Sequence, residues 1–80
     1  MRVISLKPLK EFWEIHPAAE TSLRFWYKEV SHASWKNLSE IRNTFNSVDI
    51  YQRRTIFNIG GNNTRLIARV NFKTQKVYVL

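Results

Sequence analysis

Apolar residues along this chain follow a helical spacing in the first part and an alternating spacing from Val48 onward. In the first part they recur three and four positions apart, as on one face of a helix. The dipeptide His16-Pro17 divides this part, because a residue before proline is disfavoured in the helical region. We therefore predict two helices that form a hairpin, the second opened by Pro17. Their apolar stripes are Leu6, Leu9, Phe12 and Trp13, and Leu23, Trp26, Tyr27 and Val30.

Short sequence motifs indicate where the helices begin. The run Arg2-Val3-Ile4 favours a short strand, and Ser5 stands where an N-cap would, with Pro8 in the first helical turn. Asn37 followed by Glu40 resembles a capping box, in which an acceptor and a carboxylate satisfy backbone donors that the helix leaves free. This signal predicts a short third helix with apolar positions Leu38, Ile41 and Phe45.

The alternating part predicts an antiparallel meander of strands. Gly60-Gly61-Asn62-Asn63 supplies residues that tolerate positive φ and is expected to form one turn. Lys73-Thr74-Gln75 is expected to form a second turn, which returns the chain into Lys76-Val77-Tyr78-Val79-Leu80. Together with the helices, this pattern predicts an α+β domain.

Alternation divides the predicted sheet into two unlike faces, because successive side chains of a strand point to opposite sides. The apolar face, suited to covering by helices, holds Phe57, Ile59, Leu66, Ala68, Val70, Phe72, Val77 and Val79. The other face holds Arg54, Ile56, Asn58, Arg65, Ile67, Arg69, Asn71, Lys76 and Tyr78. Arginine donors match phosphate oxygens, asparagine can read a base edge and tyrosine offers a stacking plane, so this face could bind RNA.

Net charge supports the same interpretation. The chain carries +7, and residues 41–80 hold seven Lys and Arg but one acidic residue, Asp49. An alternative is that the arginines form only the solvated outer face that any antiparallel sheet needs. Such a face usually mixes both signs of charge, whereas this one has almost no acid, so an anionic partner is the better explanation.

Length and composition limit the remaining functions. Eighty residues make one small domain, and 44% hydrophobic residues are enough for a core. The absence of cysteine excludes disulfides and thiolate metal sites, and the sequence shows no membrane span and no signal-peptide core. We expect a cytoplasmic protein with no membrane partner, no cofactor and no metal.

Other candidate chemistry is weaker. His16 and His32 have no recognisable partner in the sequence, the glutamates form no catalytic pair, and Gly60-Gly61 lacks the lysine of a phosphate loop. The helical tryptophans Trp13 and Trp26 are expected in the core.

Several stretches of the chain, in order, resemble one known family. They are Met1-Arg2-Val3-Ile4-Ser5, Leu9-Lys10-Glu11-Phe12-Trp13-Glu14, His16-Pro17, Trp26-Tyr27-Lys28, Phe57-Asn58-Ile59-Gly60-Gly61-Asn62 and Arg65-Leu66. The chain resembles the HigB family of type II toxins, within the RelE/ParE superfamily, over nearly its whole length. The resemblance implies a RelE-like fold, in which an N-terminal short strand and helical hairpin pack on a twisted antiparallel sheet.

The resemblance also implies an activity. HigB-like toxins are mRNA interferases, which are ribosome-dependent endoribonucleases neutralised by a cognate antitoxin, here a HigA-like protein. In this superfamily a ribose 2′-hydroxyl attacks the adjacent phosphate without metal. The expected partners are therefore mRNA on the ribosome and the antitoxin.

Residue roles follow from the matched positions. Arg65 matches the strand arginine that faces the scissile phosphate, and Arg54 matches a basic residue that opens the preceding strand. Asn58 and Arg69 share the predicted face and complete the expected catalytic group. Expected RNA-binding residues around them are Arg53, Asn63, Lys73, Lys76 and Tyr78.

One departure from the family affects the expected activity. Relatives continue beyond a strand like Val77-Tyr78-Val79-Leu80 into a tail with a His and a Tyr suited to proton transfer, whereas this sequence ends at Leu80. We expect residues 1–80 to form a single toxin domain that lacks this tail. Two alternatives stay open: a non-catalytic RNA-binding or antitoxin-binding module, and a ParE-like inhibitor of gyrase.

Overall fold

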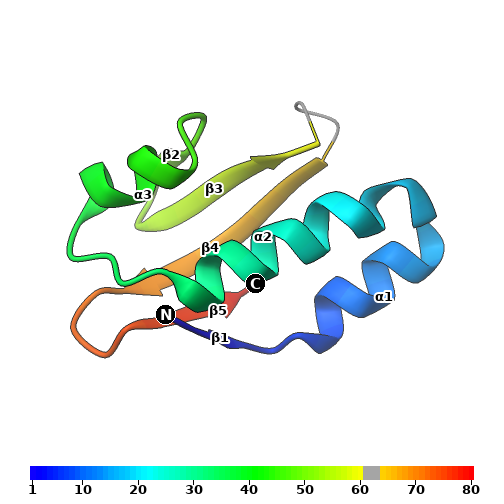
Figure 1. Ribbon diagram of the computed structural model, residues 1–80, viewed down its shortest axis with the longest axis horizontal. Coiled ribbons are helices and arrows are strands. Elements are labelled where there is room, and N and C mark those ends of the chain that lie inside the picture. The colour runs from blue at the N-terminus through cyan, green and yellow to red at the C-terminus, as the bar shows by residue number, and fades with distance from the viewer. Residues whose placement is uncertain (61–63) are drawn as a thin grey trace.

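The computed structural model, which describes residues 1–60 and 64–80, has a layer of helices on one face of a five-stranded sheet (Figure 1). The helical part contains β1 (Arg2–Ile4), α1 (Lys7–Ile15), the 3₁₀ turn η1 (Pro17–Ala19), α2 (Glu20–His32) and α3 (Leu38–Thr44). The strands β2 (Asp49–Tyr51), β3 (Arg54–Ile59), β4 (Thr64–Asn71) and β5 (Lys76–Val79) follow. The predicted α+β class is confirmed.

The sheet has the order β1-β5-β4-β3-β2. Strands β2 to β5 form the antiparallel meander that the alternating pattern predicts. Strand β1 pairs with β5 in parallel, with Val3 opposite Val77, so the sheet is mixed rather than wholly antiparallel. The N-terminal amino group donates to the carbonyl of Ala33 just after α2, which ties this edge strand to the helical layer.

The start of the first helix differs from the expected cap. Ser5 has φ 71° and lies outside the helix, and Leu6 occupies the N-cap position with no side-chain hydrogen bond. The prediction that Ser5 caps the helix is therefore wrong, because Ser5 instead takes the left-handed conformation where the chain leaves β1. Pro8 does lie in the first turn of α1, and Pro17 opens the 3₁₀ turn that leads into α2.

The third helix begins as predicted. The Asn37 side chain accepts a hydrogen bond from the Glu40 N–H at 3.1 Å. The Glu40 carboxylate reaches back to the N–H of Lys36, one residue before the position that a regular capping box uses. The turn over 73–75 is also confirmed. Gly60, at φ 61°, ends β3, while the rest of the predicted glycine–asparagine turn, 61–63, lies outside the described residues.

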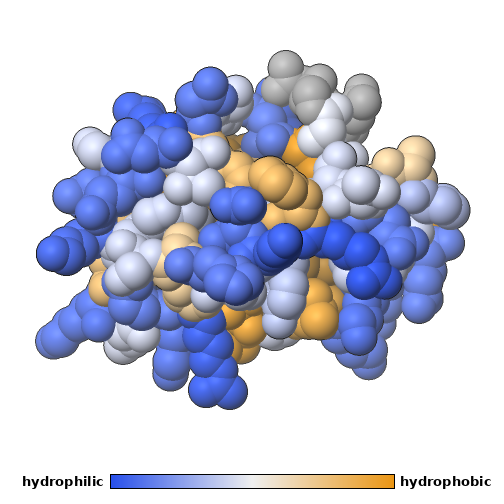
Figure 2. All heavy atoms as spheres, viewed as in Figure 1, coloured by the Kyte–Doolittle hydropathy of each residue, from blue (hydrophilic) through white to orange (hydrophobic). Residues whose placement is uncertain are grey.

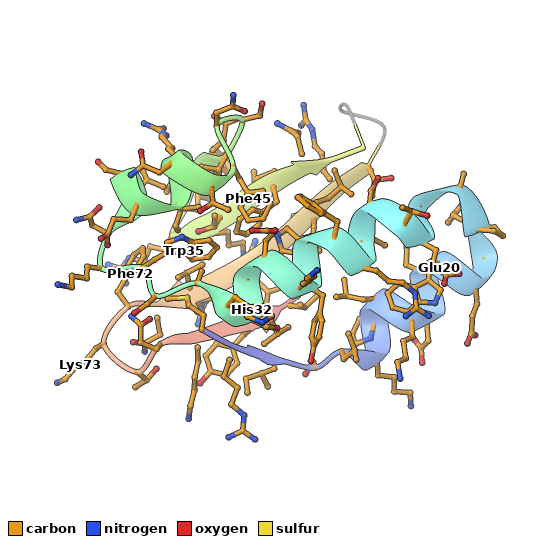
Figure 3. The ribbon with its side chains drawn as sticks, viewed as in Figure 1. Glu20, His32, Trp35, Phe45, Phe72 and Lys73 are labelled. Carbon is orange, nitrogen blue, oxygen red and sulfur yellow. The ribbon has the colours of Figure 1, made fainter. Side chains whose placement is uncertain are left out.

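The core lies between the helical layer and the sheet, and aromatic rings occupy its centre. Trp26 of α2 meets Phe57 of β3 edge to face, with ring centroids 5.3 Å apart. Phe45 contacts the same Phe57 ring at 5.4 Å and the ring of Trp35 at 6.1 Å. Trp13 and Trp26 are buried as predicted, and so is Trp35. Figure 3 shows Phe45 and Trp35 close together between α3 and the sheet.

Candidate nucleic-acid interface

The face of the sheet opposite the helices carries the basic residues. Along β3, Thr55, Phe57 and Ile59 are buried, while Arg54, Ile56 and Asn58 alternate with them and are more exposed. Along β4, Leu66 and Ala68 are buried, and Arg65, Ile67 and Arg69 are exposed. The two predicted faces are confirmed by this alternation, and we call the exposed side the open face.

Strand register arranges the open face in rows that run across the strands. Asn58 lies opposite Arg65, and Ile56 lies opposite Ile67 in the next row. Asp49 pairs with Ile56 from the other side and extends this second row. Rows on one face are two residues apart, a spacing of about 7 Å. Arg65 and Asn58, the expected partners at the scissile phosphate, are thus direct cross-strand neighbours.

The third row holds the other two arginines. Tyr51 pairs with Arg54, and Arg69 pairs with Tyr78. Because Arg54 and Arg69 lie one step beyond the paired residues Thr55 and Ala68, they are also neighbours across β3 and β4. A fourth row joins Asn71, Lys76 and Arg2. Two guanidinium groups between two tyrosines therefore lie about 14 Å from the Asn58–Arg65 pair, four residues along the strand.

The arginines of the open face keep their positive charge uncompensated. In the part of the chain that the structure describes, the two salt bridges are Lys7–Glu11 on α1 and Arg24–Glu20 on α2. Both are on the helical layer, away from the open face. Asp49 is the one acidic residue on β2 to β5 and forms neither of these bridges. The open face therefore has a positive potential suited to phosphate groups.

Asn58 has a structural contact as well as a place in the candidate site. Its Nδ2 donates to the carbonyl of Ser47 at 2.7 Å and so ties the segment before β2 to β3. This bond uses one of the two N–H groups of Nδ2, and Oδ1 is suited to accept a hydrogen bond from a base or a ribose hydroxyl.

The remaining predicted RNA-binding residues are scattered. Lys76 and Tyr78 lie half-buried on β5 of the open face, and Arg53 is exposed in the turn between β2 and β3. Lys73 lies in the β4–β5 turn, beyond the end of β4 distant from Arg65 (Figure 3). The structure does not bring Lys73 to the Arg65 group. Asn63 lies outside the described residues.

Sequence reasoning missed two features of the open face. Tyr51 is 64% exposed and lies beside Arg54. The alternating pattern that begins at Val48 could have placed Tyr51 on the open face, because Val48 is buried and Tyr51 is an odd number of residues away. A cavity of about 170 Å³ opens beside Arg65 between α1 and β4. Its apolar lining is Pro8, Leu9, Phe12, Leu23, Leu66, Ile67, Val79 and Leu80. No pattern along the chain indicated this cavity, because it depends on where α1 lies against the sheet.

The helical layer holds the histidines. His16 packs against Phe12, with ring centroids 4.6 Å apart, and His32 Nδ1 donates to the Lys28 carbonyl at 2.8 Å. Figure 2, viewed from the helical side, shows mostly polar residues around an apolar centre near α2. Within residues 1–60 and 64–80, no three metal-binding side chains gather, and no helix has the length and apolar character to cross a bilayer.

The fold and the open face together define a small α+β domain with basic residues gathered on one face of its sheet. Residues 19–80 match a family model described as HigB toxin, RelE-like toxic component of a toxin-antitoxin system. The mRNA interferase toxin HigB of Escherichia coli K12 is 30% identical over 82 residues, covering 99% of this chain and 79% of that protein. An mRNA interferase HigB of Shigella flexneri has the same identity and coverage, and one of Escherichia coli O6:H1 is 28% identical, with 99% and 80% covered.

These matches extend over most of this chain and of its relatives. The chain belongs to the HigB family of RelE-like toxins. The family resemblance inferred from the sequence motifs is thereby confirmed. The roles of individual residues stay predictions, which the geometry of the open face supports or weakens one by one.

Proposed function

We propose that this protein is the toxin of a toxin–antitoxin pair and cuts translated mRNA on the ribosome, in the cytoplasm, as one domain. The observation that carries this proposal is the Asn58–Arg65 pair on an open face whose one acidic residue is Asp49, in a chain whose relatives are named mRNA interferases. The substrate would lie across the strands of this face, with its phosphates on the arginine rows.

The reaction proposed is a transfer within the RNA strand. The ribose 2′-oxygen loses its proton and forms a bond to the adjacent phosphorus, and the bond from phosphorus to the 5′-oxygen breaks as that oxygen gains a proton. The products are a 2′,3′-cyclic phosphate and a 5′-hydroxyl end. Negative charge grows on the phosphate oxygens in the transition state, so the step needs a fixed cation beside them.

Arg65 would provide that cation. It is exposed on the open face, lies opposite Asn58 and borders the cavity beside α1. A guanidinium group offers several N–H donors in one plane and can bind two phosphate oxygens at once. Arg54 and Arg69, about 14 Å further along the strands, would hold a neighbouring phosphate rather than the scissile one.

The antitoxin is the expected protein partner, because the family is a toxin component of such pairs. We propose a HigA-like protein that covers the open face with acidic residues and thereby excludes RNA. An acidic partner complements the charge of seven Lys and Arg against one acid in residues 41–80.

Primer-extension mapping of a reporter mRNA in a translating extract tests the proposed activity. The wild-type protein should produce discrete cuts that depend on translation, and Arg65→Ala should remove them, with a loss of about 100-fold or more in rate. Arg65 is exposed, so circular dichroism and thermal unfolding of the variant should be unchanged. Lys28→Ala, which removes one exposed charge from α2, is the matched control and should cut normally. Cuts that persist in Arg65→Ala would contradict the assignment.

A second function, RNA binding without cleavage, is favoured by the composition of the open face. Among the described residues of β2 to β5, the side chains there that can exchange a proton are Asp49, Lys76, Tyr51 and Tyr78, with no histidine or glutamate. The same extract separates the two functions. Intact mRNA together with measurable RNA binding would identify a binding module, whereas translation-dependent cuts would exclude it.

A further inference from the structure

Tyr51 is a large aromatic side chain that the fold leaves in solvent. It lies at the end of the edge strand β2, is 64% exposed, and pairs with Arg54 on the open face. Trp26, Trp35 and Phe57 are buried in the core, whereas Tyr51 is more exposed than the exposed helical rings of Phe12 and Phe25. The Tyr51 ring therefore contributes comparatively little to packing.

The turn that holds Tyr51 is conformationally costly. Gln52 and Arg53 connect β2 to β3 as a two-residue hairpin loop, and both have positive φ, 49° and 65°. Such a loop is usually formed by Asn-Gly, Asp-Gly or Gly-Gly, because positive φ is unfavourable for most other residues. The tight loop sets the register that puts Tyr51 directly opposite Arg54. A strained backbone beside a candidate binding surface is an observation that points to function rather than to stability.

The surroundings of Tyr51 match the needs of a single-stranded nucleic acid. Arg54 is its cross-strand neighbour, and Arg69 follows on β4, so a stacking plane and two phosphate-binding groups lie in one row. Tyr78, half-buried, closes the row on β5. Bases stack on aromatic rings in single-strand binding sites while arginines neutralise the backbone, and stacking accepts any base.

We infer that Tyr51, held by the Gln52-Arg53 turn, is a stacking platform for a base that flanks the cleavage position. This inference rests on the proposed RNA-cutting function. The distance of about 14 Å between the third row and the Asn58–Arg65 pair places the stacked base on a nucleotide other than the one attacked. Tyr51 would thus hold the RNA in position across the open face and would take no part in the chemical step.

Fluorescence anisotropy with a short, dye-labelled single-stranded RNA tests the inference without the ribosome. Tyr51→Ala and Tyr51→Leu should weaken binding about 5-fold to 100-fold, since both remove the ring face. Leucine keeps apolar bulk, so its loss of affinity reports on the ring itself. Tyr51→Phe keeps the ring and should bind as the wild type does. Ile50→Ala is the matched control, because Ile50 is 47% exposed on the opposite face of the same strand.

A scan of abasic sites through the RNA locates the stacked base. Loss of the base at one position should weaken RNA binding by the wild-type protein but not by Tyr51→Ala, because the variant already lacks the ring on which that base stacks. If wild-type protein binds RNA and Tyr51→Leu binds equally well, the stacking inference is wrong while the proposed function stands. If wild-type protein neither binds RNA nor cuts mRNA in the translating extract, the proposed function itself fails. Equal losses at every abasic position would also contradict a specific stacking site.

Discussion

At the scale of single residues, the two sides of each strand serve different purposes. Phe57 is buried against Trp26, whereas Asn58, the next residue, lies on the open face and bonds to Ser47. Substitutions on the buried side are expected to change stability, and those on the open side to change RNA binding. Asn58 is the exception, since its amide nitrogen supports the segment before β2.

Trp26 allows the buried side to be tested. It is fully buried, and its Nε1 has no hydrogen-bond partner within the described residues. Trp26→Phe removes this unpaired donor and keeps an aromatic ring against Phe57, so we expect a loss of less than about 1.5 kcal/mol in the free energy of unfolding. Trp26→Ala leaves a large cavity and should cost about 3–5 kcal/mol.

Urea denaturation followed by circular dichroism measures both variants. If Trp26→Phe is as destabilising as Trp26→Ala, then a phenyl ring does not preserve the packing against Phe57 and the expectation is wrong.

At the scale of elements, the sequence predicted features that depend on neighbouring residues better than features that depend on distant contacts. The Asn37 cap uses a bond between residues three apart, so its pattern is visible in the sequence and the structure confirms it. Ser5 looked like a cap by the same local rule, but it has φ 71° and lies in the connection from β1 to α1. Gln75 also has a positive φ, 58°, and its side chain donates to the carbonyls of Phe72 and of Trp35, which lies 40 residues away in the chain.

The N-cap of α3 can be tested by its effect on the stability of the protein. Asn37→Ala leaves the Glu40 N–H without its side-chain acceptor and should lower the free energy of unfolding by about 0.5–2 kcal/mol. Asn37→Asp keeps an acceptor at the helix N-terminus and serves as the control, with stability equal to the wild type or slightly higher. Chemical denaturation midpoints decide the outcome. An alanine variant as stable as the aspartate variant would show that water replaces the cap at no cost.

At the scale of the whole molecule, charge is distributed by layer. The described salt bridges lie on the helices, while the open face holds arginines on β3 and β4 without acidic partners. If the open face binds single-stranded RNA as proposed, the phosphates that it neutralises should release counterions.

Salt dependence of RNA binding tests this picture. If about four cations of the open face contact phosphates, the plot of log K against log salt concentration should have a slope of about −3. Arg65→Ala should make the slope shallower by about 0.7. Lys28→Ala, on α2, changes net charge equally and should leave the slope unchanged. Equal effects of both variants would mean that RNA responds to net charge rather than to the open face.

The sequence by itself determined the features that depend on neighbouring residues. Helical and alternating periods, the Asn37 cap, the two faces of the sheet and the excess of cations after Glu40 are all local or compositional. The tertiary structure alone decided where β1 pairs and which residues face one another across the strands. The parallel β1–β5 pair, the Tyr51–Arg54 row and the cavity beside Arg65 depend on register and helix placement. These features arise from contacts between residues that are far apart in the chain. The free energy of such contacts depends on both partners, so the pattern within one segment does not reveal it.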